Sequence, residues 1–417
     1  MAQISKDSFA AGGALMSVKD AVRLLFERVP AIEERESLDL VECDGRILAE
    51  TLLAPIDLPL FDNSAVDGYA VRFGELAHEG ESILPVEGRV AAGHCLEQTS
   101  KSSAVRIFTG APMPPGFDTV FMQEDCRATD DGKVALPAGL RQGANRRLRG
   151  EDLTRGQEAL ARGRRLTPED IGLAAALGLE TLVVRRGLKA AVFSTGDEII
   201  SPGAPLRPAS VYDANRFVLH SLLRRLGIEV TDLGILTDDR QKITSALKQA
   251  AQTHDLVLTS GGVSTGDEDH VKAAISDLGS LVFWRLAVKP GRPVAMGVID
   301  GTPLIGLPGN PVAVFITFAY VARPLIAALG GALPEPLLPL PVTSGFSYKK
   351  KKGRREYVRV SLSRTIEGET IANKYPVEGA GVLTSLTRTH GLVELGEEIT
   401  SVAAGDKVGY IDYALIR

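Results

Sequence analysis

The residues best suited to bind a phosphate lie between positions 256 and 270, where the sequence reads LVLTSGGVSTGDEDH. An apolar stretch ends there in Ser260, Gly261 and Gly262, and a turn and a helix follow. Glycines at a strand-to-helix turn let backbone N–H groups converge on an anion, and the helix N-terminus adds a partial positive charge. The segment predicts an anion-binding turn, and the alternative is a plain turn whose acids cap a helix.

Acidic side chains follow this turn and two other expected strand ends. Asp267, Glu268 and Asp269 come directly after the turn. Carboxylates beside a phosphate site suit Mg²⁺, which takes one or two carboxylates together with phosphate oxygens. Glu198 follows the first strand of the same region and Asp238 follows the second, so both would project over one sheet edge. Either acid could bind a metal or a polar substrate group, although such acids more often cap helices.

Cations and a rigid loop come next along the chain. Arg285, Lys289 and Arg292 cluster at the end of one apolar strand, although the net charge of the chain is −5. Arg favours bidentate contacts to phosphate or carboxylate and Lys acts as a point charge, so the cluster indicates an anionic ligand; a solvated strand end is the alternative. Residues 306–311, GLPGNP, place two prolines before an apolar helix and would point to the same sheet edge.

Other polar segments have a spacing that by itself indicates no chemistry. These are residues 61–70 (FDNSAVDGYA), 109–112 (TGAP) and 149–152 (RGED), which lie in turn-rich sequence. Residues 349–355 hold six cations in seven positions. Without interleaved aromatic residues or a basic domain, this run is more typical of a solvated hairpin than of a nucleic-acid site.

The elements that position these residues form several domains, because 417 residues are too many for one hydrophobic core. From residue 188 to about 331, apolar strands alternate with helices, which predicts βαβ units and a mostly parallel sheet with ligands beyond the carboxyl ends of its strands. Strands are expected at 190–193, 228–235, 256–259, 282–288 and 294–298, and helices at 214–226, 241–251, 269–278 and 312–328.

The remaining sequence differs in texture. Residues 54–155 are rich in Gly and Pro with short apolar runs, which predicts an inserted β-rich domain. Helical patterns on both sides of it predict a discontinuous helical linker domain, 1–53 and 156–187, and residues 188–333 form the expected α/β domain. A proline-rich stretch then leads to a small β-barrel or sandwich at 334–417.

Composition excludes several classes of protein. A net charge of −5 argues against a global basic surface for nucleic acid or anionic membranes, and no apolar run approaches the roughly 18 residues that cross a bilayer. The N-terminal sequence lacks the apolar stretch of a signal peptide. Three cysteines, Cys43, Cys95 and Cys126, form no CxxC pair and suit a reducing cytosol. We therefore expect a cytoplasmic protein without nucleic-acid or membrane partners.

Seven segments, in order, resemble the molybdopterin molybdenumtransferases, the family of the bacterial MoeA proteins and the E domain of gephyrin. They are DNSAVDGYAV, TGAPMPPGFDTVFMQED, RGEDL, STGDE, LTSGGVSTGDEDH, WRLAVKPGRP and GLPGNPV, and the resemblance extends from about residue 16 to 410. It implies a multidomain α/β plus β fold with a doubly wound molybdopterin-binding α/β domain, an inserted β-rich domain, a helical linker domain and a C-terminal β-barrel. It also implies an elongated homodimer.

The resemblance further implies a reaction. Molybdate and Mg²⁺ meet adenylylated molybdopterin, the phosphoanhydride is cleaved, AMP leaves and the dithiolene binds molybdenum. Contact with the molybdopterin adenylyltransferase and other cofactor-assembly proteins is implied as well. Positive side chains and N–H donors must gather these anions, so catalysis would rest mainly on positioning and electrostatics.

Site residues follow from the resemblance by matching positions. The implied catalytic residues are Asp67, Thr109, Asp152, Glu198, Asp238, Asp269, Arg285 and Lys289. The implied metal ligands are Glu198, Asp238 and Asp269. The implied substrate-binding residues are Ser260, Gly261, Gly262, Ser264, Arg292, Pro308, Gly309, Asn310, Pro311, Arg354 and Ser385. Two alternatives stay open: a scaffold or binding protein that kept the fold and lost catalysis, and a related pterin- or nucleotide-cleaving enzyme.

Overall fold

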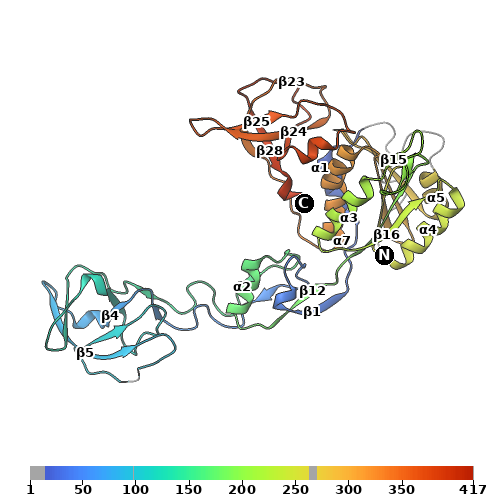
Figure 1. Cartoon of the computed structure of the whole chain (residues 1–417). Helices are drawn as coiled ribbons and strands as arrows, with labels where there is room; N and C mark the ends of the chain where they lie inside the picture. The colour runs from blue at the N-terminus through green and yellow to red at the C-terminus, as the bar shows by residue number, and fades with distance from the viewer. Residues whose placement is uncertain (1–14, 97, 263–269, 417) are drawn as a thin grey trace.

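The computed structural model describes residues 15–416 apart from residue 97 and residues 263–269. The chain is elongated (Figure 1): the inserted domain lies at one end, the α/β and C-terminal domains lie at the other, and the linker connects them. The two ends have separate hydrophobic cores, so the inserted domain is stabilised by its own burial.

The inserted domain contains a six-stranded sheet with the order β7-β4-β6-β5-β9-β8. Its strands are β4 (Gly68–Val71), β5 (Ser82–Val90), β6 (Ala104–Ile107), β7 (Thr119–Met122), β8 (Arg127–Ala128) and β9 (Lys133–Leu136). Two further short strands, β3 (Asn63–Ser64) and β10 (Arg146–Arg147), pair antiparallel. The side chains of neighbouring residues in β4 and β6 are buried on opposite faces of the sheet, which gives this small domain two apolar clusters.

The linker contains two small strand pairs and a helix. The pairs are β1 (Arg35–Asp39) with β12 (Thr181–Arg185) and β2 (Leu52–Leu53) with β11 (Glu158–Leu160), both antiparallel. Helix α2 (Pro168–Ala176) begins at a capping box, in which the Thr167 side chain accepts from the Asp170 N–H and the Asp170 carboxylate accepts from the Thr167 N–H. The local signals Thr, Pro and Asp therefore fix where this helix starts.

Helix α1 (Val18–Arg28) packs on the α/β domain. Its residues Ala21 and Leu25 are buried in the same cluster as Phe318 and Leu325. Sequence periodicity finds this helix, but its packing partner lies far along the chain, and only the folded structure brings the two together.

The α/β domain has a six-stranded sheet with the order β16-β13-β17-β21-β20-β18. Its strands are β13 (Lys189–Thr195), β16 (Glu229–Leu236), β17 (Leu256–Ser260), β18 (Ser280–Arg285), β20 (Pro293–Ile299) and β21 (Thr302–Leu307), and a short pair, β14 (Ile199–Ile200) with β15 (Val211–Tyr212), stands beside it. Its helices include α3 (Asn215–Arg225), α4 (Arg240–Thr253) and α5 (His270–Leu278).

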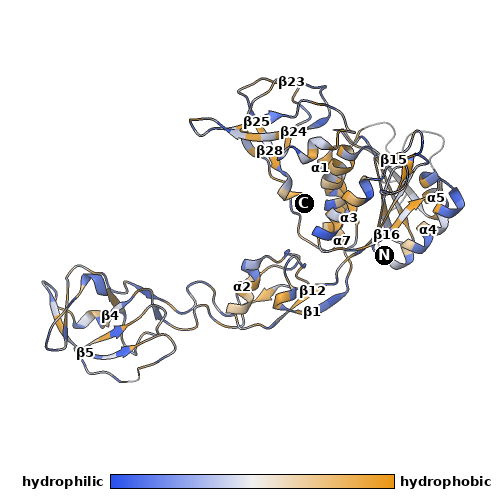
Figure 2. Cartoon of the chain, viewed as in Figure 1, coloured by the Kyte–Doolittle hydropathy of each residue, from blue (hydrophilic) through white to orange (hydrophobic). Residues whose placement is uncertain are grey.

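Both faces of this sheet are covered, so the domain is doubly wound as expected. Along β13, Ala190 and Val192 are buried with residues of α3 and α1, whereas Ala191 and Phe193 are buried with residues of α4 and α5. Figure 2 shows this arrangement as hydrophobic colour on the central strands and on α7, with hydrophilic colour on the outer surfaces of α4 and α5.

Two features of the sheet differ from the sequence expectation. The expected strand 282–288 is in fact β18 and a second strand, β19 (Val288–Lys289), which pairs with the C-terminal domain. Strand β21 was not expected; it follows β20 across Asp300 and Gly301, whose φ angles are 48° and 89°. An Asp-Gly pair with positive φ is typical of a two-residue hairpin, and β20 consequently runs antiparallel to both of its neighbours.

One long apolar helix crosses the core. It consists of α6 (Pro311–Thr317), a π-helical turn (Phe318–Ala322) and α7 (Arg323–Leu329). Pro324 has no N–H to donate, which accounts for the interrupted hydrogen-bond ladder. The span Pro311–Leu329 has the length and hydropathy of a membrane helix, which corrects the expectation that no apolar run approaches that length. Because 89% of its apolar window is buried inside the protein, it serves as a core helix.

The C-terminal domain is a barrel with the strand order β19-β24-β25-β22-β28-β26, and an additional pairing of β24 with β26 closes it. Its strands are β22 (Leu340–Ser344), β24 (Arg355–Arg364), β25 (Thr370–Lys374), β26 (Gly391–Leu395) and β28 (Lys407–Asp412), with β23 (Tyr348–Lys349) paired to β27 (Ser401–Val402) and a short helix α8 (Thr384–Thr387). Strand β19 joins this sheet with Lys289 opposite Glu356, so the α/β domain and the barrel share a strand pair at Lys289.

Candidate functional site

Three parallel strands end side by side in the α/β domain, where Ser194, Ser260 and Leu307 are cross-strand neighbours. We call these strand ends and the loops after them the rim (residues 194–198, 260–262 and 307–311). The Gly261 N–H donates to the Leu307 carbonyl at 3.2 Å, and the Ser260 hydroxyl donates to the Pro308 carbonyl at 3.3 Å. The structure therefore brings the SGG turn and the GLPGNP loop into direct contact.

Glycine is required at two positions of the rim. The φ angles of Gly261 and Gly262 are 93° and 64°, which favours glycine. A Cβ on Gly261 would lie 2.5 Å from the Thr195 carbonyl oxygen, and one on Gly262 would lie 2.6 Å from a methyl carbon of Val271. A side chain at either position would push the turn away from β13.

Asn215, at the start of α3, connects the loops of the rim and was not predicted. Its Nδ2 donates to the Ser260 hydroxyl at 2.8 Å and to the Gly309 carbonyl at 2.7 Å. Its Oδ1 is buried without a partner in the described part of the chain, as are the hydroxyls of Thr195 and Thr259. Buried polar atoms without protein partners usually bind water or a ligand. No clear sequence signal marks this residue, because an Asn at a helix start normally indicates a cap.

The acids predicted at the strand ends occupy those places. Glu198 follows β13 and Asp238 follows β16, and neither carboxylate has a hydrogen bond or ion pair within the described residues. The Glu198 carboxylate folds over Gly196, where an added Cβ would lie 2.6 Å from Oε2. Ser264 and Asp269 lie outside the described residues. Among the residues that are described, no three His, Cys, Asp or Glu side chains lie close enough together to hold a metal ion. The three-carboxylate metal site therefore stays a prediction.

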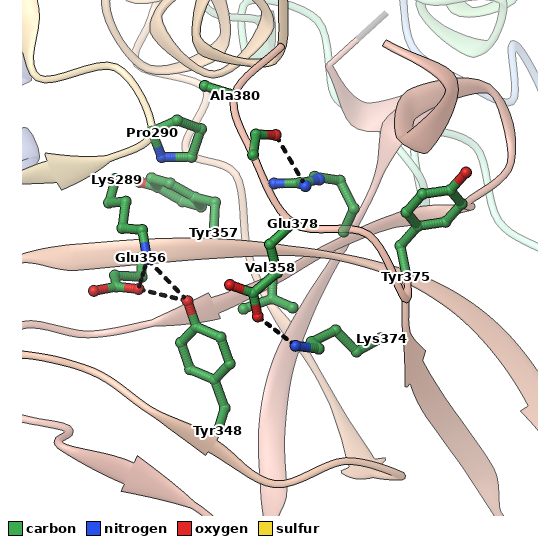
Figure 3. Close-up of a pocket in the computed structure, with 12 residues that line it drawn as sticks. Lys289, Pro290, Tyr348, Glu356, Tyr357, Val358, Lys374, Tyr375, Glu378 and Ala380 are labelled. Atoms are coloured by element: carbon green, nitrogen blue, oxygen red, sulfur yellow. Dashed lines mark hydrogen bonds and ion pairs between the residues drawn. The ribbon is translucent and has the colours of Figure 1, made fainter. Parts of the chain in front are cut away.

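A pocket opens beside Lys289, where the barrel meets the α/β domain (Figure 3). Lys289 Nζ lies 3.5 Å from Glu356 Oε2 and 3.4 Å from the Tyr348 hydroxyl. The buried Glu356 carboxylate also accepts from the Tyr348 hydroxyl at 2.8 Å and from Arg354 Nε at 2.7 Å. Burial and the bond to Glu356 raise the pKa of Tyr348, so its hydroxyl stays protonated. Two predicted residues thus converge on a glutamate that sequence analysis missed.

Arg359 lines the same pocket and was also missed. It donates from Nε to the Ser385 hydroxyl at 3.0 Å and from Nη2 to the Gly379 carbonyl at 3.2 Å. Ser385 is fully buried and donates to the Val382 carbonyl at 2.6 Å. The structure pairs Ser385 with Arg359, a residue that the resemblance did not assign to the site. Burial lowers the pKa of Arg359, but a guanidinium starts so high that it stays charged.

Of three further cations, the structure places one in the pocket wall. Lys374 lines it and pairs with Glu378 at 2.5 Å. Arg292 is exposed and has no side-chain partner within the described residues. Arg285 ends β18, and its side chain lies outside what the structure describes.

The pocket and the rim meet at the first turn of α6. The Val312 N–H donates to the carbonyl of Ala380, a residue of the pocket wall, at 2.9 Å. The loop after Lys289 also packs closely on α6, since a Cβ on Gly291 would lie 2.7 Å from the Thr317 methyl carbon. The GLPGNP loop, whose last proline begins α6, therefore lies between the SGG turn and the cationic pocket.

The polar segments of the inserted domain gather around one hydrogen-bonded pair. Asp67 Oδ1 accepts from the Thr109 N–H at 2.8 Å and from the Thr109 hydroxyl at 2.7 Å. These two bonds lower the pKa of Asp67. Arg149 N–H donates to Asp62 at 2.8 Å, which joins the RGED and FDNSAVDGYA segments. Asp152 is exposed in the same segment, without a side-chain partner among the described residues.

Within a single chain, the polar cluster around Asp67 and Thr109 lies far from the rim. Figure 1 shows the inserted domain, with β4 carrying on from Asp67, at the opposite end of the molecule from the α/β sheet. The predicted catalytic residues therefore form two separate groups within a single chain.

The basic run at 349–355 is largely held by the barrel. Lys350 is buried and donates to the Ile399 carbonyl at 2.7 Å. Arg355 pairs with Glu394 at 2.8 Å and with Glu397 at 3.0 Å. The expectation of a solvated hairpin is therefore correct for only part of the run. The acids at 394–398, which pair with several of its cations, were not considered in that expectation.

Comparison with known proteins bears on the whole length of the chain. Residues 16–178 match the MoeA N-terminal region (domain I and II), residues 191–328 match a probable molybdopterin binding domain, and residues 341–413 match the MoeA C-terminal region (domain IV). The molybdopterin molybdenumtransferase of Haemophilus influenzae is 37% identical over 396 residues, which cover 94% of this chain and 98% of that protein. The chain belongs to the MoeA family.

Other relatives agree with this assignment. Molybdopterin molybdenumtransferase 2 of Mycobacterium tuberculosis is 34% identical over 408 residues, which cover 94% of this chain and 98% of that protein. The crystal structure of the molybdopterin biosynthesis MoeA protein from Pyrococcus horikoshii OT3 superposes with a TM-score of 0.81 at 27% identity, covering 96% of this chain and all of that one. The resemblance read from the seven sequence segments and the fold class that it implied are both confirmed.

Proposed function

We propose that this chain is a molybdopterin molybdenumtransferase, which inserts molybdenum from molybdate into adenylylated molybdopterin and releases AMP. Membership of the MoeA family supports a role in molybdenum cofactor biosynthesis. The observation that carries the finer proposal is the contact between two anion-binding features, the glycine-rich rim and the cationic pocket, at the first turn of α6.

The rim suits the diphosphate of the adenylylated pterin. Gly261 and Gly262 bring backbone close to a strand end, and the loop 308–311 leads into α6, whose N-terminus carries the partial positive charge of the helix dipole, although its Val312 N–H already donates to the Ala380 carbonyl. The buried, unpartnered Oδ1 of Asn215 adds an acceptor that a hydroxyl or amino group of the substrate can satisfy.

The pocket suits the doubly charged oxyanion. Lys289, Arg359 and Lys374 line it together with the carboxylates of Glu356 and Glu378. Cations preorganised by buried partners lose little entropy when they meet charge that develops in a reaction. Lys289 is the most available of them, since its side chain is 48% exposed while the Glu356 carboxylate holds it in place. Molybdate in this pocket would lie next to the GLPGNP loop of the rim.

Magnesium fits two acids that follow strands of the α/β sheet. Glu198 and Asp238 are carboxylates without a protein cation partner among the described residues, which is the donor set that Mg²⁺ prefers. They would hold the ion, with Asp269 as the third predicted ligand. When bound, Mg²⁺ supplies positive charge that offsets the phosphate oxygens.

We further propose that the active form is a homodimer in which the inserted domain of one copy reaches the rim of the other. The elongated shape supports this proposal, because Asp67, Thr109 and Asp152 cannot reach the rim of their own chain without a large rearrangement (Figure 1). Asp67 would add an ionised carboxylate, oriented by Thr109, to the same reaction.

The test is AMP release from adenylylated molybdopterin with molybdate and Mg²⁺. We expect Lys289→Ala to lower turnover by about 100-fold, as for loss of a preorganised charge contact, without changing the melting temperature. Lys352→Ala is the matched control, because within the described part of the chain this lysine pairs only with the exposed Glu398, at 2.9 Å. Absence of AMP release from the authentic substrate would contradict the proposal and would favour a scaffold role.

A further inference from the structure

A second charged cavity lies where the linker meets the α/β domain, at the opposite edge of the sheet from the rim. Gly187 and Leu188, which precede β13, line it together with Gly227 and Ile228, which precede β16. The rim is formed at the carboxyl ends of the same strands. This cavity is therefore separate from the proposed active site.

Arginine dominates the lining. The cavity wall contains Arg46, Arg165 and Arg185 from the linker and Arg224, Arg225 and Arg323 from the α/β domain. A seventh, Arg186, forms two hydrogen bonds with Asp255 at 3.0 and 2.9 Å. Only two lining residues are acidic, Asp44 and Glu335. In a chain with a net charge of −5, this local excess of positive charge needs an explanation.

Neighbouring carboxylates neutralise part of that charge. Arg46 is paired with Glu36, just outside the lining. Arg165 and Arg323 share the single carboxylate of Glu335, at 2.9 and 3.2 Å. Consequently one negative charge faces two positive charges at this point of the wall, and an excess of positive charge remains.

Arg185 is buried without any carboxylate partner in the described chain. It is 5% exposed, and of its five N–H donors only one on Nη1 is accepted by protein there, by the Ile32 carbonyl at 2.8 Å. Burial lowers its pKa, and the nearby Arg162 and Arg35 lower it further, while the weaker effect of Glu33 raises it. A buried cation without an ion-paired carboxylate is costly for the fold, so an anion supplied from outside would relieve this cost.

Arg224 and Arg225 end α3 and have no side-chain partner within the described residues. Cations at a helix C-terminus are favoured by the helix dipole, which explains why arginines occur in this turn. The dipole does not explain why the same turn shares a cavity with Arg185 and with the Arg165–Arg323 pair.

We propose that this cavity binds a small anion that carries one or more phosphate groups. Guanidinium groups contact phosphate oxygens through two parallel hydrogen bonds, and several of them around one cavity match a compact charge of two or more. A small molecule fits better than an acidic peptide, because the walls come from the linker, the α/β domain and residues 414–415 and surround the space on several sides. An anion held there would contact both domains and fix their relative orientation.

Calorimetric titration of the full chain with inorganic diphosphate, inorganic phosphate and AMP, at constant ionic strength, tests the proposal and separates a free phosphate source from a nucleotide. We expect diphosphate affinity to fall at least about tenfold in the double variant Arg224→Gln, Arg225→Gln, because each charge-assisted contact is worth about that factor. Arg364→Gln is the matched control: it is also exposed and without a partner in the described chain, but lies at the end of β24 and does not line the cavity.

Lys289→Ala separates this site from the cationic pocket and Gly261→Ala separates it from the rim, since diphosphate binding at the arginine cavity should persist in both variants. Deuterium exchange should also slow at 185–188 and 224–228 when diphosphate is added. Unchanged affinity in the arginine double variant, or loss of binding in Lys289→Ala alone, would overturn the proposal. Binding of a poly-glutamate peptide that is weakened in the arginine double variant, while diphosphate does not bind, would assign the cavity to an acidic protein segment instead.

Discussion

The rim and the inserted domain position polar groups in opposite ways. At the rim, backbone approaches backbone: Gly261 lies so close to the Thr195 carbonyl that no Cβ fits. Asn215 connects two loops of the rim through two hydrogen bonds. In the inserted domain, the carboxylate of Asp67 accepts, among the described residues, hydrogen bonds from the N–H and hydroxyl of Thr109 alone. The first arrangement fixes its geometry through packing, whereas the second adjusts one charge through two hydrogen bonds.

This contrast indicates a division of labour. A rigid rim suits the binding of substrate phosphates, because a preformed anion site gains most from fixed donors. A half-buried carboxylate on a separate domain suits a group that must approach from outside. Since one chain holds the two groups at opposite ends, the comparison predicts that neither region is sufficient without a second copy.

The largest expected effect comes from mixing two inactive chains. Asp67→Ala and Lys289→Ala should each lose about 100-fold of the AMP-release rate, but mixed dimers of the two chains should regain about half of the wild-type rate, because one of their two sites is intact. Purification through two different tags and an AMP assay measure this. Mixing Lys289→Ala with itself is the control. If the mixed dimers stay inactive, the proposed sharing of sites between copies is wrong.

A glycine substitution tests whether packing fixes the rim. Gly261→Ala should lower the free energy of unfolding of the α/β domain by about 2–3 kcal/mol, because its φ is 93° and its Cβ would overlap the Thr195 carbonyl. Gly309→Ala is the matched control for stability, since nothing lies within 4 Å of a Cβ there. Denaturant unfolding followed by tryptophan fluorescence reads out the α/β domain, which holds Trp284, the single tryptophan of the chain. Equal stability of the two variants would show that the rim adapts.

The smallest effect concerns the pH dependence set by the inserted domain. Thr109→Val removes one of the two hydrogen bonds that lower the pKa of Asp67, while the N–H bond, which is the larger cause, remains. The pKa should therefore rise towards its ordinary value, and the acid limb of the pH–rate profile should move to higher pH. Thr109→Ser keeps the hydroxyl and should retain the wild-type profile. If the pH–rate profiles of the Val and Ser variants have identical acid limbs, the proposal that Asp67 takes part in the reaction is wrong.

Much of the candidate site could be predicted, and the omissions have a common cause. Ser260, Gly261 and Pro308 were assigned to one sheet edge because residues at the ends of parallel strands must meet there. Asn215, Glu356 and Arg359 were missed. Each acts through a contact with a distant segment, such as the pairing of β19 with β24, and no local pattern marks such a contact.

The sequence by itself determined most elements of the α/β domain and their order, although not β19 and β21, because apolar periodicity, helix caps and glycine turns act over a few residues. It also determined the family, through seven segments whose order could be compared along the whole chain. Only the tertiary structure decided that Lys289 is held by Glu356, that Ser385 pairs with Arg359, and that seven arginines surround one cavity. These depend on which segments become neighbours when apolar surfaces are buried, and burial is a property of the whole fold.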